Sequence, residues 1–365
     1  MKKTAIILFI LLVCITSGWI LLNRSMPTET PEPEKPVIKI GAVLPLSGDV
    51  AAIGQAFQQA IQMFENDLAS RDTRFAYAFI VEDGQFKPDR SIAAAQKLVN
   101  LDHVDALISA GTPINNVVLP ITEKNKVLFF ASGGFTGEYG SYAFDLLPPR
   151  DIQAAALVRE LENRNISSVS VVCSNLMGWI DLCEELKNRI EKSESIKLKD
   201  SAVVQPSDKD FGILTIKMAA EKPQMIVTLL VSPQLEIFTK VLARQDEAIQ
   251  TTTIEGFIYP EDKSLFEGKW FMNTPVPTED YAARFMAYTN TNTTNLSEMA
   301  YMALEVLVAA YEKAGHDNEA AAKAIEGHAF VTEALGDISF TANRQLVVEP
   351  VVLVIKDGAV VRLEK

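Results

Sequence analysis

Three short turns in the first part of the chain carry the residue types best suited to holding a small ligand. Each follows an apolar, β-rich run and consists of small or hydroxyl residues: Leu46-Ser47-Gly48, Ala110-Gly111-Thr112-Pro113 and Ser132-Gly133-Gly134. Small residues let a ligand approach the main chain closely. Ser47 and Thr112 also stand just before helical patterns, where unpaired N–H groups and the helix dipole favour a carboxylate. The alternative is that both residues only cap their helices.

Catalytic and metal-binding signatures are absent from the sequence. The chain has three histidines, which are far apart and have no cysteines beside them. There is no G-x-S-x-G elbow and no G-x-x-x-x-G-K-[ST] loop, and the Gly-rich stretch 133–140 lacks the lysine and the helix that phosphate binding uses. The sequence therefore predicts a binding protein rather than an enzyme, with no metal and no cofactor.

The turns belong to an alternation of strand and helix patterns. Strand-like runs at 37–44, 75–82, 106–109 and 127–131 are separated by helical patterns at 51–70, 89–101 and 114–123. A second series of this kind covers 151–245, and an Asp-Gly turn predicts a hairpin over 351–363. Such alternation predicts an α/β protein with two doubly wound parallel-sheet lobes. In such sheets, ligands bind outside the carboxyl ends of the strands, where the three turns are expected.

The amino terminus has the pattern of an export signal. Lys2 and Lys3 precede an uncharged apolar stretch, 5–22, and a Pro-rich spacer follows at 26–36. As a helix the stretch would be about 27 Å long, close to the hydrocarbon thickness, which predicts an uncleaved membrane anchor. A cleaved signal peptide and a lipoprotein signal at Cys14 are the alternatives. All three place the globular part on the periplasmic or extracellular side of the membrane.

The charge balance limits the partners. With 34 basic and 47 acidic residues the formal net charge is −13. Nucleic acids and anionic lipid surfaces need a basic footprint, so neither is expected as a partner. Beyond Cys14 the chain has only Cys173 and Cys183, and their spacing leaves open whether they form a disulfide or stay as two buried thiols.

Four stretches resemble the type I periplasmic solute-binding proteins, in particular the leucine/isoleucine/valine-binding family of ABC transport receptors. They are IKIGAVLPLSGDVAAIGQAFQQAIQMFENDL, EDGQFKPDRSIAAAQKLVN, VLFFASGGFTGEYGSYAFDLLPPRDIQAAAL and EMAYMALEVLVAAYEKAG. The resemblance runs from about Val37 to the carboxyl terminus. It implies two lobes joined by three crossings, with the ligand held between them and closure by hinge motion.

The resemblance also implies a division of the chain. The expected parts are 1–24 as signal or anchor, 25–36 as linker, 37–147 plus 254–330 as lobe 1, and 148–253 plus 331–365 as lobe 2. It further implies that the three turns hold the carboxylate and part of the ammonium group of an amino acid. The ligand-binding residues that it selects are Ser47, Thr112, Pro113, Ser132, Gly133, Gly134, Met177, Ser232, Phe257 and Tyr259.

The chain departs from the family pattern in the second lobe. Met177 stands where the family commonly has an aromatic residue, and Phe257 and Ile258 stand where an acid is expected for the ammonium group. A buried ammonium group without a carboxylate partner is costly. Glu255, Tyr259 or Glu261 could supply that partner from a shifted loop. A less polar pocket for an apolar or aromatic carboxylate is the alternative, built from Ile53, Met177, Trp179 and Phe257.

Two functions follow from this reading. The first is an extracytoplasmic receptor that captures a small carboxylate-bearing or amino-acid-like solute for uptake by an ABC permease. The second is a membrane-anchored sensor or protein-interaction module of the cell envelope that uses the same fold, and the predicted anchor at 5–22 suits it well.

Overall fold

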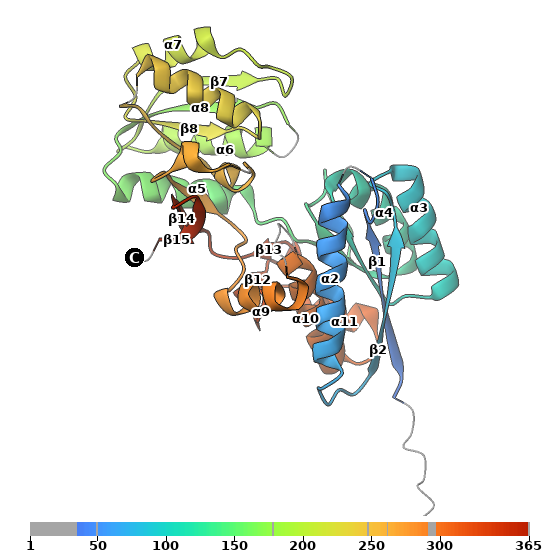
Figure 1. The fold of residues 1–365 in the computed structure, drawn as a ribbon. Coiled ribbons are helices and arrows are strands. Elements are labelled where there is room, and N and C mark those ends of the chain that lie inside the picture. Colours follow the sequence, from blue (N-terminus) through green and yellow to red (C-terminus); the bar gives the residue numbers. More distant parts are fainter. Residues whose placement is uncertain are drawn as a thin grey trace, which may run out of the picture.

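The alternation of apolar strands and amphipathic helices produces two α/β lobes joined by three crossings of the chain (Figure 1). The computed structural model describes residues 35–48, 50–176, 179–246, 248–260, 262–290 and 297–363. The crossings lie at 146–149, 274–278 and 348–350. The predicted fold class, two parallel-sheet lobes with a three-stranded connection, is confirmed.

Lobe 1 is built on a five-stranded parallel sheet with the order β2-β1-β3-β4-β5. Its strands are β1 (Val37–Leu44), β2 (Ala76–Asp83), β3 (Ala106–Ala110), β4 (Leu128–Ser132) and β5 (Ala143–Asp145). One face packs against α2 (Ala51–Leu68), α9 (Glu279–Thr289), α10 (Ser297–Ala314) and α11 (Asn318–Ile325). The other face packs against α3 (Pro88–Lys97), the π-helix η1 (Leu98–Asp102) and α4 (Thr112–Asn125).

The apolar spacing of the first helix explains this packing. Residues at intervals of three and four place Phe57, Ile61 and Phe64 on one stripe of α2, and all three are buried against the sheet. A small antiparallel sheet completes the lobe, formed by β11 (Ala329–Thr332), β12 (Gly336–Phe340) and β13 (Leu346–Val347).

Lobe 2 repeats the strand order of lobe 1 in a four-stranded parallel sheet, β7-β6-β8-β9. Its strands are β6 (Ser168–Ser174), β7 (Lys197–Val204), β8 (Met225–Leu229) and β9 (Gln250–Thr252). Helices α5 (Arg150–Asn163) and α6 (Trp179–Lys192) cover one face, and α7 (Gly212–Ala220) and α8 (Gln234–Gln245) cover the other. Two 3-10 turns, η2 (Gly256–Ile258) and η3 (Ser264–Phe266), follow β9.

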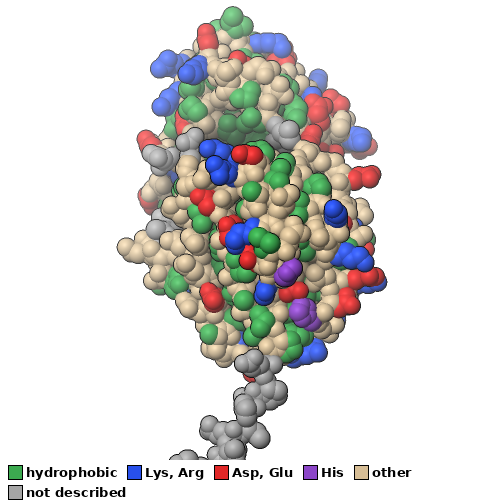
Figure 2. All heavy atoms as spheres, turned by 90° about the vertical axis from the view of Figure 1, so that its right-hand side faces the viewer, with side chains coloured by type: hydrophobic (Ala, Val, Ile, Leu, Met, Phe, Trp, Pro, Cys, Tyr) green, Lys and Arg blue, Asp and Glu red, His purple; other side chains and the backbone are tan. Residues whose placement is uncertain are grey.

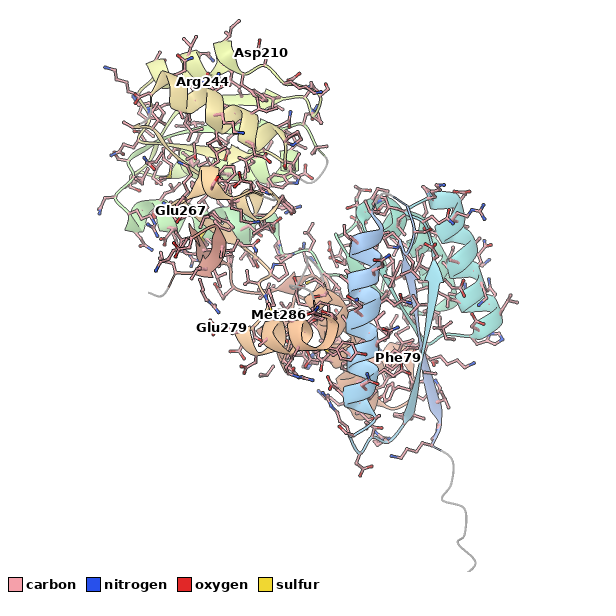
Figure 3. The ribbon with its side chains drawn as sticks, viewed as in Figure 1. Phe79, Asp210, Arg244, Glu267, Glu279 and Met286 are labelled. Atoms are coloured by element: carbon pink, nitrogen blue, oxygen red, sulfur yellow. A yellow bond between two sulfur atoms is a disulfide. The ribbon has the colours of Figure 1, made fainter. Side chains whose placement is uncertain are left out.

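The predicted C-terminal hairpin is confirmed and belongs to lobe 2. Strand β14 (Val351–Lys356) pairs with β15 (Ala359–Arg362) on one side and with β10 (Trp270–Asn273) on the other. Glu267, labelled in Figure 3, accepts hydrogen bonds from the N–H groups of Asp357 (2.9 Å) and Gly358 (3.1 Å) in the hairpin turn. The hairpin is therefore fixed to the body of the lobe at its turn.

Two segments were predicted in one lobe and lie in the other. Residues 254–273 were expected with lobe 1, but Ile254, Phe257 and Trp270 pack in the cores of lobe 2. Residues 331–347 were expected with lobe 2, but Ile338 and Phe340 pack in the core of lobe 1. The reason is long-range pairing: β10 joins β14, and β11 to β13 form their own sheet beside α10.

Cys173 and Cys183 form a disulfide, which answers a question that their spacing left open. The bond joins the end of β6 to α6 inside the core of lobe 2. The predicted anchor at 5–22 lies outside the described residues. Among the described residues, no helix has the length and apolar character needed to cross a membrane.

Candidate functional site

The turns after β3 and β4 form one continuous surface at the carboxyl edge of the lobe 1 sheet. The two strands are neighbours in parallel register, so their ends meet at the same edge. The Gly111 N–H donates to the Ser132 carbonyl (2.8 Å), and the Thr112 hydroxyl donates to the Gly133 carbonyl (2.6 Å). Two of the three predicted ligand turns are therefore joined directly to each other.

Asn115 holds these turns together from inside, and the sequence reading missed it. Its side chain is buried in the second turn of α4. Its amide nitrogen donates to the carbonyls of Ser132 (2.9 Å) and Gly134 (2.8 Å), and its amide oxygen accepts from the Ser109 hydroxyl (2.6 Å). The available signal was weak, because Asn115 stands beside a second asparagine, Asn116, between Ile114 and Val117.

The surface presents hydrogen-bond donors that no described residue uses. The N–H groups of Thr112 and Gly133 have no acceptor in the described part of the chain. The Ser132 hydroxyl is buried and likewise has no hydrogen-bond partner there. Gly133 has a φ of +86°, and a Cβ atom on it would lie 3.3 Å from the Gly111 Cα, so the close fit requires glycine. Such convergent donors at a helix amino terminus suit a carboxylate.

Ser47 lies at the same edge and makes a hydrogen bond within lobe 1. Its hydroxyl donates to Asp83 Oδ2 (2.6 Å), while the Leu46 and Gln85 N–H groups donate to Oδ1 (3.0 and 2.9 Å). Burial works to raise the pKa of Asp83, but the hydrogen bonds from Ser47, Gln85 and Leu46 outweigh it and hold the pKa below its ordinary value. Ser47 thus joins the ends of β1 and β2.

A cavity of about 830 Å³ lies between the lobes and reaches the surface formed by the β3 and β4 turns. Ser132 and Gly133 line it from lobe 1, and Glu255, Tyr259 and Lys263 line it from lobe 2. In Figure 2 apolar side chains border the hollow between the upper and lower lobes. At its other end the cavity reaches Glu279 and Met286 on α9, close to the second crossing (Figure 3).

Lobe 2 contributes a carboxylate to this cavity. Glu255 lies between β9 and η2 in the left-handed region (φ +63°), and its N–H donates to the Met272 carbonyl (2.8 Å). The Tyr259 hydroxyl donates to its carboxylate. Burial raises the pKa of Glu255 above its ordinary value, although the positive charge of Arg150 and the Tyr259 hydrogen bond each lower it. A cation in the cavity would therefore stabilise the ionised carboxylate.

Several predicted site residues lie elsewhere. Phe257 is fully buried in the core of lobe 2, where its ring stacks on Phe266 (centroids 4.6 Å apart), so it does not line the cavity. The Ser232 hydroxyl donates to Glu236 on α8 and is also outside the cavity. Met177 and Glu261 lie outside the described residues. Thr112, Pro113 and Gly134 belong to the joined turns but do not line the cavity themselves.

Of the alternative apolar pocket of Ile53, Met177, Trp179 and Phe257, the three residues that the structure describes do not line the cavity. Ile53 packs partly buried against the core of lobe 1, and Trp179 does the same in lobe 2. Each helix turns its apolar stripe toward its own sheet, so these side chains fill the cores. In the described residues, no group of three or more His, Cys, Asp and Glu side chains is arranged to hold a metal ion.

The family model described as "Periplasmic binding protein" matches residues 37–358, nearly the whole described chain. The chain belongs to the type I periplasmic binding proteins. The resemblance seen in the sequence is therefore confirmed. Among curated relatives, the Leu/Ile/Val-binding protein BraC3 of Rhizobium johnstonii is 26% identical over 330 residues, covering 83% of this chain and 87% of that protein.

Solved structures share the fold at lower identity. A branched chain amino acid ABC transporter periplasmic ligand-binding protein from Burkholderia xenovorans has a TM-score of 0.79 at 14% identity, covering 90% of this chain and 94% of the other. A solute binding protein of an ABC transporter from Rhodopseudomonas palustris, in complex with 3,4-dihydroxybenzoic acid, has a TM-score of 0.73 at 16% identity, covering 90% and 96%. Periplasmic binding proteins are extracytoplasmic receptors for small solutes.

Proposed function

We propose that this protein is the receptor of an ABC-type uptake system and captures an amino-acid-like solute between its lobes. The observation that carries the proposal is the pairing of opposite chemistries across one cavity. Unused N–H and hydroxyl donors on lobe 1 suit the carboxylate of the solute, and Glu255 on lobe 2 suits its ammonium group. A permease then receives the solute, and no chemical conversion is proposed.

The relatives support this choice of solute class. The curated relative carries a name for binding leucine, isoleucine and valine, and one structural neighbour holds an aromatic acid. Both kinds of solute have a carboxylate, but only the amino acids have the ammonium group that Glu255 would meet. The carboxylate in the cavity therefore favours amino acids over simple aromatic acids.

A ligand panel tests the proposal. Purified protein is heated with L-leucine, L-phenylalanine, benzoate or 4-hydroxybenzoate, and its unfolding is followed. A bound solute at one hundred times its dissociation constant adds about 2.7 kcal/mol to the free energy of unfolding. We expect one of the amino acids to give this stabilisation and Ser132→Ala to reduce it. An absence of any response in well-folded protein would contradict the proposal.

The tethering of the protein stays a separate proposal. We infer from residues 5–22 that an amino-terminal segment holds the receptor on the outer face of the membrane. Fractionation of cells followed by amino-terminal sequencing tests this, because a cleaved segment would release the protein. The sensor or interaction-module alternative gains support only if the protein binds a solute and co-purifies with an envelope protein other than a permease.

A further inference from the structure

An aromatic residue with unusual backbone geometry stands beside the joined turns of lobe 1. Phe86 follows β2 in the turn 84–87, and both Gln85 and Phe86 have a φ of +53°. Two successive non-glycine residues in the left-handed region are uncommon and strained. The turn is held by hydrogen bonds from Gln85 N–H to Asp83 Oδ1 (2.9 Å) and from Lys87 N–H to the Gly84 carbonyl (2.9 Å).

The ring of Phe86 reaches across the end of β1 to the turn after β3. A Cβ atom added to Gly111 would lie 2.4 Å from Phe86 Cε2 and 2.9 Å from Cζ, so the ring rests directly on the glycine backbone. Gly111 in turn touches Gly133, which lines the cavity. The Phe86 ring, the Gly111 backbone and Gly133 are therefore successive neighbours, and of these three Gly133 lines the cavity.

The Phe86 side chain is partly exposed. Phe86 is 38% exposed, whereas Phe129 and Phe130 on strand β4 of the same sheet are fully buried. The Phe86 ring therefore has free apolar surface at the same edge as the unused donors of Thr112, Ser132 and Gly133. A left-handed turn that holds an exposed aromatic ring at a ligand surface suggests a role in binding rather than in packing alone.

We propose that Phe86 is a specificity-determining residue that selects solutes with an apolar body. When the lobes close, the carboxylate of the solute rests on the Gly133 N–H group and the Ser132 hydroxyl, and its branched or aromatic side group packs on the Phe86 ring. The inference rests on the proposed function and adds to it the expectation that a short amino acid binds more weakly than an apolar one. No described residue of lobe 2 is needed for this selection.

The test is a calorimetric titration of L-leucine, L-phenylalanine and L-alanine into the intact protein and its variants. Phe86→Ala should raise the dissociation constant of L-leucine and L-phenylalanine at least tenfold and that of L-alanine less than threefold. Phe86→Leu keeps an apolar contact and should stay within threefold of the wild type for L-leucine. Leu101→Ala is the matched control, since Leu101 is 73% exposed on η1, at the end of α3 away from the turns.

The outcomes separate this inference from the proposed function. Unchanged affinity for L-leucine and L-phenylalanine in Phe86→Ala, together with weaker binding in Ser132→Ala, overturns the inference and leaves the proposed function in place. An equal weakening for all three amino acids, with a lower melting temperature of the unliganded variant, assigns Phe86 a structural role and also overturns it. A wild-type protein that binds none of the three overturns the proposed function, and the inference fails with it.

Discussion

The two lobes share a strand order but present different chemistry to the cavity between them. Each sheet runs in the order second, first, third, fourth strand, and each has a buried amide that ties its turns together, Asn115 in lobe 1 and Gln234 in lobe 2. Lobe 1 offers main-chain N–H groups and a hydroxyl, whereas lobe 2 offers side chains, among them the carboxyl group of Glu255 and the amino group of Lys263. In the proposed function, the turns of lobe 1 would meet the carboxylate of the solute and Glu255 of lobe 2 its ammonium group.

The difference follows from the residues at the strand ends. In lobe 1, the turns after β3 and β4 pack closely against each other at Gly111 and Gly133. Neither glycine has a side chain that would cover the main chain. In lobe 2, the chain after β8 instead turns through Ser232 and Pro233, and the Gln234 amide donates to the Gln205 carbonyl (2.6 Å) and accepts from the Ser174 hydroxyl (3.2 Å). The Gln234 amide thus makes its hydrogen bonds within lobe 2. The side chains that line the cavity from lobe 2, such as Glu255 and Tyr259, follow β9 instead.

The largest effect is expected from removing the amide of Asn115. Asn115→Ala leaves the Gly134 carbonyl and the Ser109 hydroxyl without their partner, at about 1–3 kcal/mol each, while the Ser132 carbonyl keeps the Gly111 N–H, so lobe 1 should lose about 4 kcal/mol of unfolding free energy. Chemical denaturation measures this loss. The control is Asn116→Ala, whose amide bonds only Thr136 near the surface and should cost less than about 1 kcal/mol. Equal losses in the two variants would contradict the role given to Asn115.

A somewhat smaller effect is expected in lobe 2 from removing its disulfide. Replacing Cys173 and Cys183 by alanine opens a covalent loop whose ends are 10 residues apart, which should cost about 3 kcal/mol. Amide hydrogen exchange should accelerate in β6 and α6 and stay unchanged in β3 and β4, because the lobes have separate cores. Faster exchange in both lobes alike would show that their cores are energetically coupled.

The smallest effect concerns pH and a buried carboxylate of lobe 1. Burial raises the pKa of Glu305 to about 7, although N–H groups of Glu333 and Ala334 donate to it. Because the folded state then binds the proton more tightly than the unfolded state, stability is lost as the pH rises through about 7. The expected loss between pH 6 and pH 8 is about 1.4 kcal/mol.

Glu305→Gln isolates this contribution. Burial also raises the pKa of Asp145, to about 6, and so adds a slope of the same sign at lower pH. Denaturation curves give the free energy of unfolding at pH 6 and at pH 8. The difference between these two free energies should be smaller in Glu305→Gln than in the wild type. An unchanged difference would mean that Glu305 does not titrate in this range. In contrast to Glu255, Glu305 is satisfied by its own lobe, so its replacement should leave solute affinity unchanged.

The sequence predicted the helices and strands more completely than the contacts between them. Regular apolar spacing located the strands and helices of both sheets, because burial against a sheet imposes that spacing locally. The turns at 110–113 and 132–134 were predicted for the same reason, since they follow directly from the strand ends. Their joining through Asn115 was not predicted, because it depends on the side-by-side placement of β3 and β4.

The structure differs from the prediction where a residue's position depends on pairing between strands that are far apart in the sequence. Phe257 was selected as a ligand residue, but the left-handed backbone at Glu255 and the pairing of β10 with β14 put its ring in the core. The same geometry places Glu255 at the cavity, whereas the sequence alone does not distinguish Glu255 from Tyr259 and Glu261 as the partner of an ammonium group. Ser47 matched the family motif, yet its hydroxyl is engaged by Asp83 on a strand 36 residues away.

The most direct measurement compares an amino acid with the same molecule lacking its amino group. L-Leucine and 4-methylpentanoate are titrated into the wild type and Glu255→Gln, and both dissociation constants are recorded for each protein. If lobe 2 holds the ammonium group while lobe 1 holds the carboxylate, Glu255→Gln should weaken L-leucine binding by about 100-fold. Binding of 4-methylpentanoate should then change less than threefold. An equal change for both molecules, or no change for L-leucine, would contradict the division of the solute between the lobes.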